Sequence, residues 1–469
     1  MNKELVVKSM FWTFVCALVC VCSFFIMHNA AWLLGDDCQS IIYTGWDKPI
    51  FGFFVDPAFG RFFPLDYTIY DVLCLFYDGQ IPPSAHFFMH VLGFILFVGS
   101  FASIALYLLR KTEYWYKYLV AFLVVILAVG RTLALFVECW TGIWTIFAFL
   151  ALFLLCHIKF KDTHKWSWAI VGLLALNYIL YYYETMFVIP LSLGVCAFLF
   201  SYKKMDKNDK IYNGLLIASG VLFLLLYAVL VLPRVERFYS HHIDVSPLMN
   251  AAKMFFAQKI MWVVLVFLLF RVYLFIKRKA QFNTYDNLLL ASCAYCVGAA
   301  FLGLNYTLYF IPGTLVAIPA ILHFSNEYLK KTGTIILFVC LALFYGRYIP
   351  KAISSNQKNR VSTYNNVQQF IKEIGNDGHV YFYELENPAL EEWELDVRSC
   401  HKFYLETVTG WYMNDKDFSI ERKYDFNNEP GLWQVYKADL ETFEQLCPSA
   451  EEIINFGEYK AYRIPNNQE

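Results

Sequence analysis

Charged side chains are scarce in this sequence, and the positive ones have no excess over the negative ones. Asp, Glu, Lys and Arg make up 16% of the 469 residues, and the formal net charge is -1. Soluble domains carry about a quarter of charged residues, so this composition excludes an ordinary soluble fold. The missing basic excess argues against a nucleic-acid partner, because neutralising phosphates requires clustered Lys and Arg.

The sequence also lacks internal repeats, low-complexity linkers and a signal-peptide cleavage pattern. Its first apolar run, residues 9–34, is longer than the apolar core of a typical signal peptide. No small-residue cleavage site follows it. We therefore expect this run to be a retained helix.

Long apolar runs are what the chain has in abundance. Hydrophobic residues are 58% of the sequence and the mean hydropathy is +0.45. Runs of about 17 to 25 residues are long enough to cross a hydrocarbon core of about 30 Å as helices. We predict an all-α polytopic membrane protein with about eleven transmembrane helices. The predicted spans are 9–34, 85–109, 118–137, 140–158, 166–181, 186–202, 211–232, 260–276, 287–304, 306–324 and 333–349.

The distribution of Lys and Arg predicts the orientation. Alternate connections, beginning with Lys3 and Lys8 and continuing at 110–117, 159–165 and 203–210, are rich in these residues. Loops kept in the cytoplasm carry such an excess, so the N-terminus is expected inside. An odd number of crossings then places the segment after residue 349 outside, whereas an even number would place it inside.

The predicted outer face has three connections longer or more polar than a turn requires. They are residues 35–84, 130–139 and 233–259. Aromatic residues in the first connection suit the membrane interface, and the third contains an apolar stripe beside two lysines. We expect one or two short helices lying flat in the first connection.

Asp36 and Asp37 form the strongest candidate for chemistry. They follow Gly35 where the first helix is expected to leave the membrane. A carboxylate at this place can take a proton from an attacking hydroxyl group, and ionisable residues near a membrane are by default functional candidates. Two aspartates also mark an ordinary solvated helix end, and the pair alone does not decide between these interpretations.

Two further motifs strengthen the functional interpretation. Gly60-Arg61-Phe62-Phe63-Pro64-Leu65-Asp66 lies in the same outer connection, and Tyr181-Tyr182-Tyr183-Glu184-Thr185 lies at the outer mouth of a later helix pair. The combination resembles the bacterial membrane glycosyltransferases of the GT-C superfamily. The resemblance covers the helical three quarters of the chain. It implies a polyprenyl-phosphate sugar donor, transfer on the non-cytoplasmic face, a base at Asp36 or Asp37, and a supporting role for Arg61.

Arg61 suits a phosphate by its own chemistry. Its planar guanidinium makes paired, charge-assisted hydrogen bonds, and a cation beside a departing phosphate spreads the developing negative charge. An interfacial arginine that anchors the loop to lipid head groups would look the same.

Two single acids are weaker candidates for substrate binding. Glu184 needs a partner or a water-filled cavity at its expected depth, so it either lines the site or bonds to a neighbouring tyrosine. Glu138 lies in the short second outer connection, where a structural contact with Arg131 is the simpler interpretation.

Two histidines and an outer basic cluster complete the candidates. His86 and His90 are spaced so that both rings face one way on a helix. They could take part in a divalent-metal site, but spacing fixes no third ligand, so we predict substrate or interface contacts and no firm metal site. Arg234 and Arg237 suit either the donor phosphate or lipid head groups.

The segment 351–469 differs from the helical domain at 1–350. It is polar and rich in tryptophan and tyrosine, with an amphipathic helix predicted at 361–374 and strands at 379–383 and 458–464. We expect a small α/β extracytoplasmic domain. Its aromatic residues Trp393, Trp411 and Tyr412 suit either sugar stacking or a hydrophobic core.

The sequence-based hypothesis is a multi-pass glycosyltransferase of a bacterial inner membrane. Its expected partners are a polyprenyl-phosphate-linked sugar, a glycan or lipid acceptor and membrane lipids; a divalent cation is compatible with the family. A lipid-linked-sugar flippase and a polysaccharide polymerase or ligase are the alternatives. A transporter usually has ionisable groups or broken helices near the bilayer midplane, whereas the charges here gather at one face.

Overall fold

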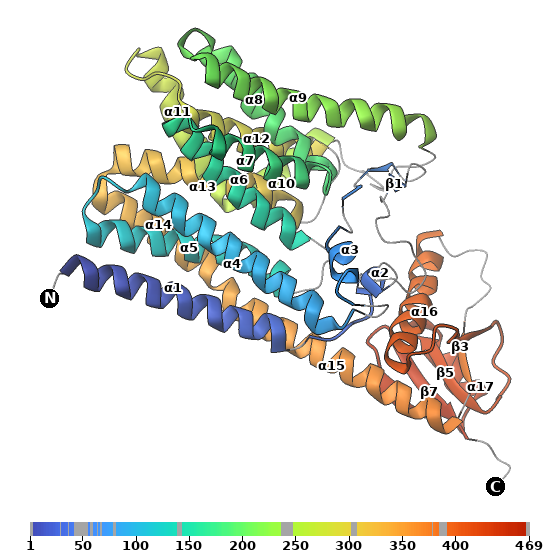
Figure 1. Cartoon of the computed structure of the whole chain (residues 1–469). Coiled ribbons are helices and arrows are strands. Elements are labelled where there is room, and N and C mark those ends of the chain that lie inside the picture. Colours follow the sequence, from blue (N-terminus) through green and yellow to red (C-terminus); the bar gives the residue numbers. More distant parts are fainter. Residues whose placement is uncertain are drawn as a thin grey trace.

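The structure is a computed structural model of the whole chain. It describes residues 3–28, 30–35, 37–41, 55–56, 60–62, 64–65, 68–77, 81–137, 143–235, 247–301, 307–377, 379–383 and 392–465. Most of these residues are helical, and a small sheet lies near the C-terminal end (Figure 1).

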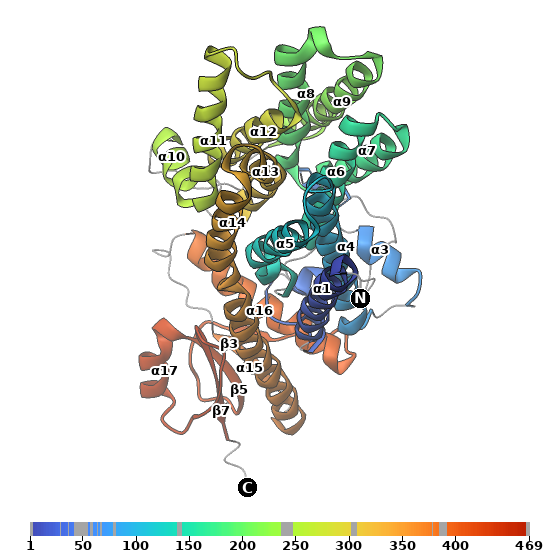
Figure 2. The same cartoon turned by 90° about the vertical axis from the view of Figure 1, so that its left-hand side faces the viewer.

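A bundle of long helices forms the larger part of the molecule. Its helices are α1 (Lys3–His28), α4 (Pro83–Leu108), α5 (Tyr114–Val137), α6 (Ile143–Thr163), α7 (Trp166–Leu180), α8 (Val188–Ser201), α9 (Lys207–Leu230), α11 (Lys259–Ile276), α12 (Thr284–Phe301), α13 (Ile311–Phe324) and α14 (Lys330–Gly346). The helices α1, α4, α5 and α14 pack side by side in one part of the bundle, and α8 packs between α9 and α12 in another (Figure 2).

Each predicted span overlaps one of these helices. Within the described ranges, eight helical stretches are long and apolar enough to cross a membrane. One of the eight, Thr307–Gly375, contains the last two predicted spans, and α7 is apolar but shorter. The chain is therefore a mostly helical protein with several candidate membrane spans, while the count of eleven stays a prediction.

Close helix packing depends on glycine at several places, two of which show how near the neighbouring helix lies. A Cβ on Gly130 of α5 would lie 2.4 Å from the backbone oxygen of Tyr345 in α14, and one on Gly93 of α4 would lie 2.1 Å from the Trp144 ring in α6. Small residues let membrane helices approach this closely, which increases van der Waals contact where no hydrophobic effect drives association.

Short elements lie at one end of the bundle, on the side of the C-terminal domain (Figure 1). They are the helices α2 (Asp37–Ile41) and α3 (Thr68–Cys74) and the two-stranded ribbon of β1 (Val55–Asp56) and β2 (Arg61–Phe62), all from the first outer connection. The amphipathic helix α10 (Pro247–Ala257) precedes α11. Ion pairs between lysine or arginine and acids gather at the opposite end, as in Arg110–Asp162 at 2.8 Å. The orientation of the two ends stays a prediction.

The C-terminal domain is a five-stranded sheet with helices around it. The strands are β3 (Val380–Tyr383), β4 (Glu421–Lys423), β5 (Gly431–Tyr436), β6 (Glu451–Asn455) and β7 (Tyr459–Ile464), in the order β4-β3-β5-β7-β6. The strand β3 is parallel to β4 and β5, and β7 is antiparallel to β5 and β6. The helices are α16 (Glu392–Met413) and α17 (Leu440–Leu446). The predicted strands at 379–383 and 458–464 correspond to β3 and β7.

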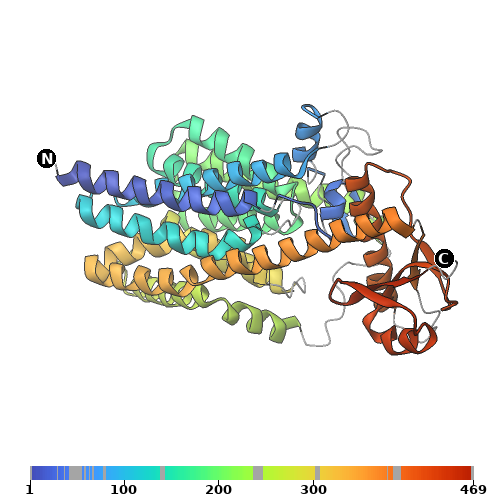
Figure 3. The ribbon, with the colours of Figure 1, turned by 90° about the horizontal axis from the view of Figure 1, so that it is seen from below.

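One long helix joins the bundle to this domain. Helix α15 (Tyr348–Asp377) has 30 residues, packs on α5 near its start, and lies beside the sheet near its end (Figure 3). The sequence predicted only its last half as a separate amphipathic helix. The structure shows instead a nearly continuous helical path from α14 into the domain.

Candidate functional site

Asp37 lies at the start of α2 and faces inward. Its side chain is 3% exposed, and its Oδ2 accepts a hydrogen bond from the backbone N–H of Leu33 at 2.8 Å. The turn between them depends on Gly35, whose φ of +106° is a conformation that side-chain-bearing residues rarely adopt. Asp36, the other member of the predicted acidic pair, lies outside the described residues.

Arg360 of α15 reaches the same turn. Its Nη1 lies 3.9 Å from Asp37 Oδ2 and donates to the carbonyl oxygen of Ala31 at 2.9 Å. Its Nε donates to Asn356 Oδ1 at 3.2 Å, and its guanidinium lies over the Phe87 ring at 4.6 Å. A buried charge is stable only when it is paired and hydrogen-bonded. The two residues therefore support each other in a buried position.

The segment that leads to Asp37 is also held by the C-terminal domain. The backbone N–H of Trp32 donates to Tyr412 Oη of α16 at 2.8 Å. The Trp32 ring is fully buried and packs edge-on against Trp411 at 6.3 Å between ring centres. Burial raises the pKa of Tyr412, so its hydroxyl is neutral and suited to a hydrogen bond. Tyr412 and Trp411 thus take part in packing rather than lying open for sugar stacking.

His86 and His90 lie beneath this segment, on the buried face of α4. Their Nε2 atoms are 3.0 Å apart, and His90 Nδ1 is 3.1 Å from the carbonyl oxygen of Phe136. If His90 Nδ1 carries the proton for that carbonyl, its Nε2 accepts from His86. Tyr70 of α3 stacks on the His86 ring at 5.2 Å. The geometry gives both rings a packing role, and their predicted contact with substrate stays a prediction.

Arg61 and Glu184 come together although they are far apart in the sequence. Glu184 opens a short 3-10 turn, Glu184–Phe187, before α8. Its Oε1 lies 3.3 Å from Arg61 Nε and accepts a hydrogen bond from the backbone N–H of Phe62 at 2.7 Å. Both side chains are about one quarter exposed, at 27% and 24%. The carboxylate thus holds the arginine motif against the tyrosine motif.

Further contacts fix the same part of the first outer connection. Tyr227 Oη of α9 donates to the carbonyl oxygen of Gly60 at 2.8 Å. The backbone N–H of Leu65 donates to the carbonyl oxygen of Tyr181 at 3.0 Å. Burial, aided by neighbouring tyrosines and Glu184, raises the pKa of Tyr183 well above its ordinary value. Tyr183 is therefore a neutral hydroxyl beside the ion pair.

Of the remaining candidates, only Arg234 lies within the described residues, and it is not brought into this arrangement. Glu138 and Arg237 lie outside the described residues. Arg234 is exposed, and its Nη1 donates to the carbonyl oxygen of Leu230, the last residue of α9, at 3.2 Å. Arg131, the expected partner of Glu138, hydrogen-bonds Gln258 and Thr314, the latter at 3.3 Å. These bonds tie α5 to α13 and to the start of α11.

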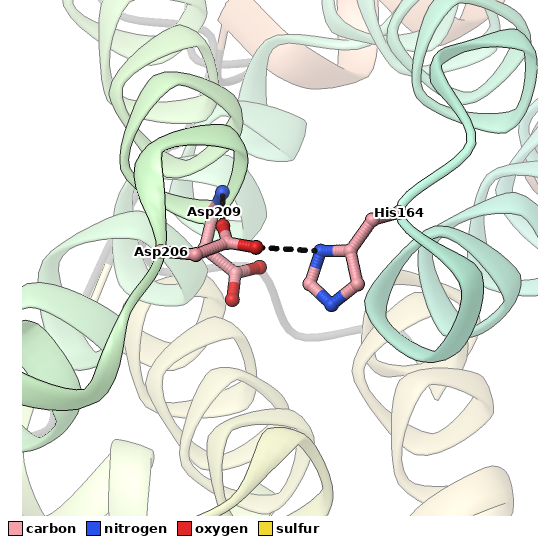
Figure 4. Close-up of side chains that lie close together, drawn as sticks. All are labelled: His164, Asp206 and Asp209. Atoms are coloured by element: carbon pink, nitrogen blue, oxygen red, sulfur yellow. Dashed lines mark hydrogen bonds and ion pairs between the residues drawn. The ribbon is translucent and has the colours of Figure 1, made fainter.

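Three potential metal ligands meet at the other end of the bundle. Within the described part of the chain, the one group of this kind is His164, Asp206 and Asp209, whose ligand atoms lie within 4.8 Å of one another (Figure 4). His164 Nδ1 is 3.4 Å from Asp206 Oδ2, and Lys161 Nζ is 2.9 Å from Asp209 Oδ1. Because the lysine already pairs with one carboxylate, the group is explained as a network of ion pairs between α6 and α9.

Sequence reasoning did not find Arg360 or the hydroxyl of Tyr412. Both lie more than three hundred residues from the segment that they contact. Arg360 stands in a polar stretch of α15 whose pattern is that of a solvated helix. Its one local signal is Asn356, four residues earlier, which can brace an arginine on the same helical face.

The architecture of this chain is similar to that of solved protein structures. No family model and no curated protein matches the chain. Among solved structures, ArnT from Cupriavidus metallidurans in the apo state superposes with a TM-score of 0.53 and 10% identity, over 98% of this chain and 100% of ArnT. The chain therefore shares its overall fold with ArnT. Because the match covers nearly the whole chain, the shared fold includes the C-terminal domain as well as the bundle.

Archaeoglobus fulgidus oligosaccharyltransferase structures are also similar. The apo form has a TM-score of 0.49 and 11% identity over 92% of this chain and 70% of that one. The complex with an inhibitory peptide and a dolichol-phosphate has a TM-score of 0.46 and 11% identity over 93% and 70%.

Proposed function

We propose that this protein is an integral-membrane glycosyltransferase. It transfers a sugar from a polyprenyl-phosphate donor to a cell-surface glycan or lipid on the non-cytoplasmic face of a bacterial inner membrane. The observation that carries the proposal is the pairing of Arg61 with Glu184 in a GT-C fold, at the end of the bundle that also holds Asp37. A donor whose tail stays in the bilayer presents its phosphate and sugar at the membrane interface, where we expect this end to lie.

The proposed reaction needs a base and a cation. The acceptor hydroxyl oxygen attacks the anomeric carbon while the bond from that carbon to the phosphate oxygen breaks. The polyprenyl phosphate leaves with the electron pair, and a carboxylate of the Asp36–Asp37 pair takes the hydroxyl proton. Direct attack inverts the configuration of the sugar.

Arg61 is the proposed partner of the departing phosphate. Its guanidinium makes charge-assisted hydrogen bonds to phosphate oxygens and stabilises the charge that develops on them. Glu184 orients the guanidinium from the Nε side and fixes the adjacent backbone. Keeping the side chain in one orientation removes an ordering step from the reaction.

The other proposed substrate contacts are His86, His90, Glu138, Arg234 and Arg237. The last three belong to outer connections and suit the acceptor or the donor phosphate by charge. A divalent cation is compatible with carboxylates at the acidic pair. Titration of the transfer rate with a chelator would decide whether a cation takes part.

The proposal is tested by a transfer assay in proteoliposomes. The substrates are radiolabelled polyprenyl-phosphate hexose and a crude extract of cell-surface glycans, with an Asp36→Asn/Asp37→Asn double variant and the exposed-site control Asp425→Asn. Label should enter the glycan with the wild type and the control but not with the double variant. Movement of labelled lipid across the bilayer without transfer would establish a flippase instead. Assembly of labelled sugar into long chains would establish a polymerase.

A further inference from the structure

Three contacts join Ala31, Trp32 and Cys38, at and just before α2, to the C-terminal part of the chain. Arg360 Nη1 donates to the carbonyl oxygen of Ala31 at 2.9 Å, and the backbone N–H of Trp32 donates to Tyr412 Oη at 2.8 Å. Cys38 Sγ donates to the carbonyl oxygen of Tyr404 in α16 at 3.4 Å. Ala31, Trp32 and Cys38 are thus held from α15 and α16.

The packing around these contacts is continuous. Trp32, Cys38 and Ile41 share one buried apolar cluster with Val367 of α15 and Val408 of α16. Helix α2 also packs directly on α16. The C-terminal part of the chain therefore packs against one side of the segment that leads into the acidic pair.

Within the acidic pair, the side chain of Asp37 faces Arg360 of α15. A general base must come within hydrogen-bond distance of the substrate hydroxyl. Asp37 is 3% exposed, and its Oδ2 both accepts from Leu33 N–H and lies beside Arg360. A carboxylate engaged in this way is suited to holding the backbone turn at Gly35. It is poorly suited to meeting an acceptor sugar.

We propose that Asp37, Arg360 and Tyr412 are positioning residues that hold residues 31–38 against the C-terminal domain, so that Asp36 alone serves as the base. The C-terminal domain is then part of the active site and not a separate binding module. The assignment of the base rests on the proposed glycosyltransferase function, whereas the coupling of segment and domain does not.

Hydrogen exchange on the purified full chain tests the coupling without any activity. Tyr412→Phe removes only the hydroxyl that accepts from Trp32 N–H, and its matched control is Tyr424→Phe, which changes an exposed tyrosine of the same domain. Losing a hydrogen bond of about 1 kcal/mol should speed exchange in the 31–41 peptide by about fivefold to tenfold. The control should leave this peptide unchanged. An unchanged 31–41 peptide in Tyr412→Phe would overturn the coupling.

The arginine is tested in the same way. Arg360→Met should speed exchange in the 31–41 peptide, and Arg360→Lys should restore part of the protection because the charge remains beside Asp37. Lys358→Met removes an exposed cation two residues away on the same helix and should have no effect. Equal protection in Arg360→Met and wild type would remove Arg360 from the proposal.

Transfer kinetics test the division of roles. Per folded molecule, Tyr412→Phe should lower kcat by about threefold to tenfold while the KM for the donor changes less than about twofold, because the phosphate partner is untouched.

Asp37→Asn should keep the acid limb of the pH-rate profile, and Asp36→Asn should lose measurable transfer. An Asp37→Asn enzyme without activity beside a working Asp36→Asn enzyme would reverse the assignment. A wild type without transfer would refute the proposed function, and the exchange results alone would then decide whether the coupling exists.

Discussion

Glu184 holds Arg61 and the neighbouring Phe62 with a single carboxylate oxygen. The Oε1 atom lies 3.3 Å from Arg61 Nε and accepts from the backbone N–H of Phe62 at 2.7 Å. A residue between two membrane helices thereby fixes both the side chain and the backbone of a loop 122 positions earlier. The two contacts can be separated experimentally, because an amide oxygen can replace one of them and not the other.

Glu184→Gln should slow transfer without unfolding the protein. The glutamine oxygen still accepts from Phe62 N–H, but the attraction to the arginine is lost. Removing a charge-assisted contact of about 1.4 kcal/mol corresponds to a tenfold lower rate. Initial transfer rates at saturating donor measure this effect, and Glu184→Ala should be slower still. A glutamine variant at the wild-type rate would show that the charge of Glu184 has no role.

Arg61→Lys should be impaired less than Arg61→Ala. Lysine keeps the positive charge but cannot make the paired hydrogen bonds of the guanidinium. If Arg61 stabilises the departing phosphate, the alanine variant should lose about a hundredfold or more in kcat. The readout is kcat against KM for the donor, at equal amounts of folded protein. Wild-type activity in Arg61→Ala would reduce the residue to a lipid anchor.

Gly130→Ala should destabilise the bundle. The new Cβ would lie 2.4 Å from the backbone oxygen of Tyr345, so α5 and α14 must move apart. Overpacking of this kind costs about 1 to 3 kcal/mol. The matched control is Gly99→Ala in α4, where a Cβ has nothing within 4 Å. Thermal unfolding in detergent should show a lower Tm for Gly130→Ala only, and equal Tm values would mean that the helices are farther apart.

Acid should weaken the C-terminal domain through His401. Burial lowers the pKa of His401 to about 4, and its ring stacks on Tyr459 at 3.8 Å. Between pH 6.5 and 4 the unfolded chain binds this proton more readily than the folded one, so stability falls as the pH falls. The loss is roughly 2 kcal/mol once partial solvent access is considered. Below pH 4 both states are protonated and this group causes no further loss.

The measurement is thermal unfolding of the full chain from pH 7 to pH 4. His401→Gln removes the titrating group, so its Tm should fall less over this range than that of the wild type. Parallel Tm curves for the two proteins would show that His401 does not contribute to the acid sensitivity.

The helices were predictable from the sequence because a bilayer imposes their length and apolarity. The predicted spans 85–109 and 118–137 differ from α4 and α5 by only a few residues at each end. The continuous helix α15 was not predictable in the same way. Its first half is too polar for a span, and sequence pattern alone does not tell a helix that continues from one that begins anew.

The candidate site was predictable in part. The sequence placed the motifs of Arg61 and Glu184 on the same outer face, but it predicted no contact between these two residues. The inward direction of the Asp37 side chain was not predictable. Two adjacent aspartates look the same in the sequence whether they face solvent or a buried arginine. The role of Arg360 could not be found because Ala31 and Asp37 lie over three hundred residues away from it and follow no periodic pattern.

The most direct test of the account is the transfer rate of Asp36→Asn beside that of Asp425→Asn, with polyprenyl-phosphate hexose and the glycan extract in proteoliposomes. Loss of a general base typically lowers the rate by about a hundredfold to ten-thousandfold. The account predicts a loss in this range for Asp36→Asn and an unchanged rate for the exposed-site control. Equal transfer by both variants would contradict it, because Asp36 would then not supply the base.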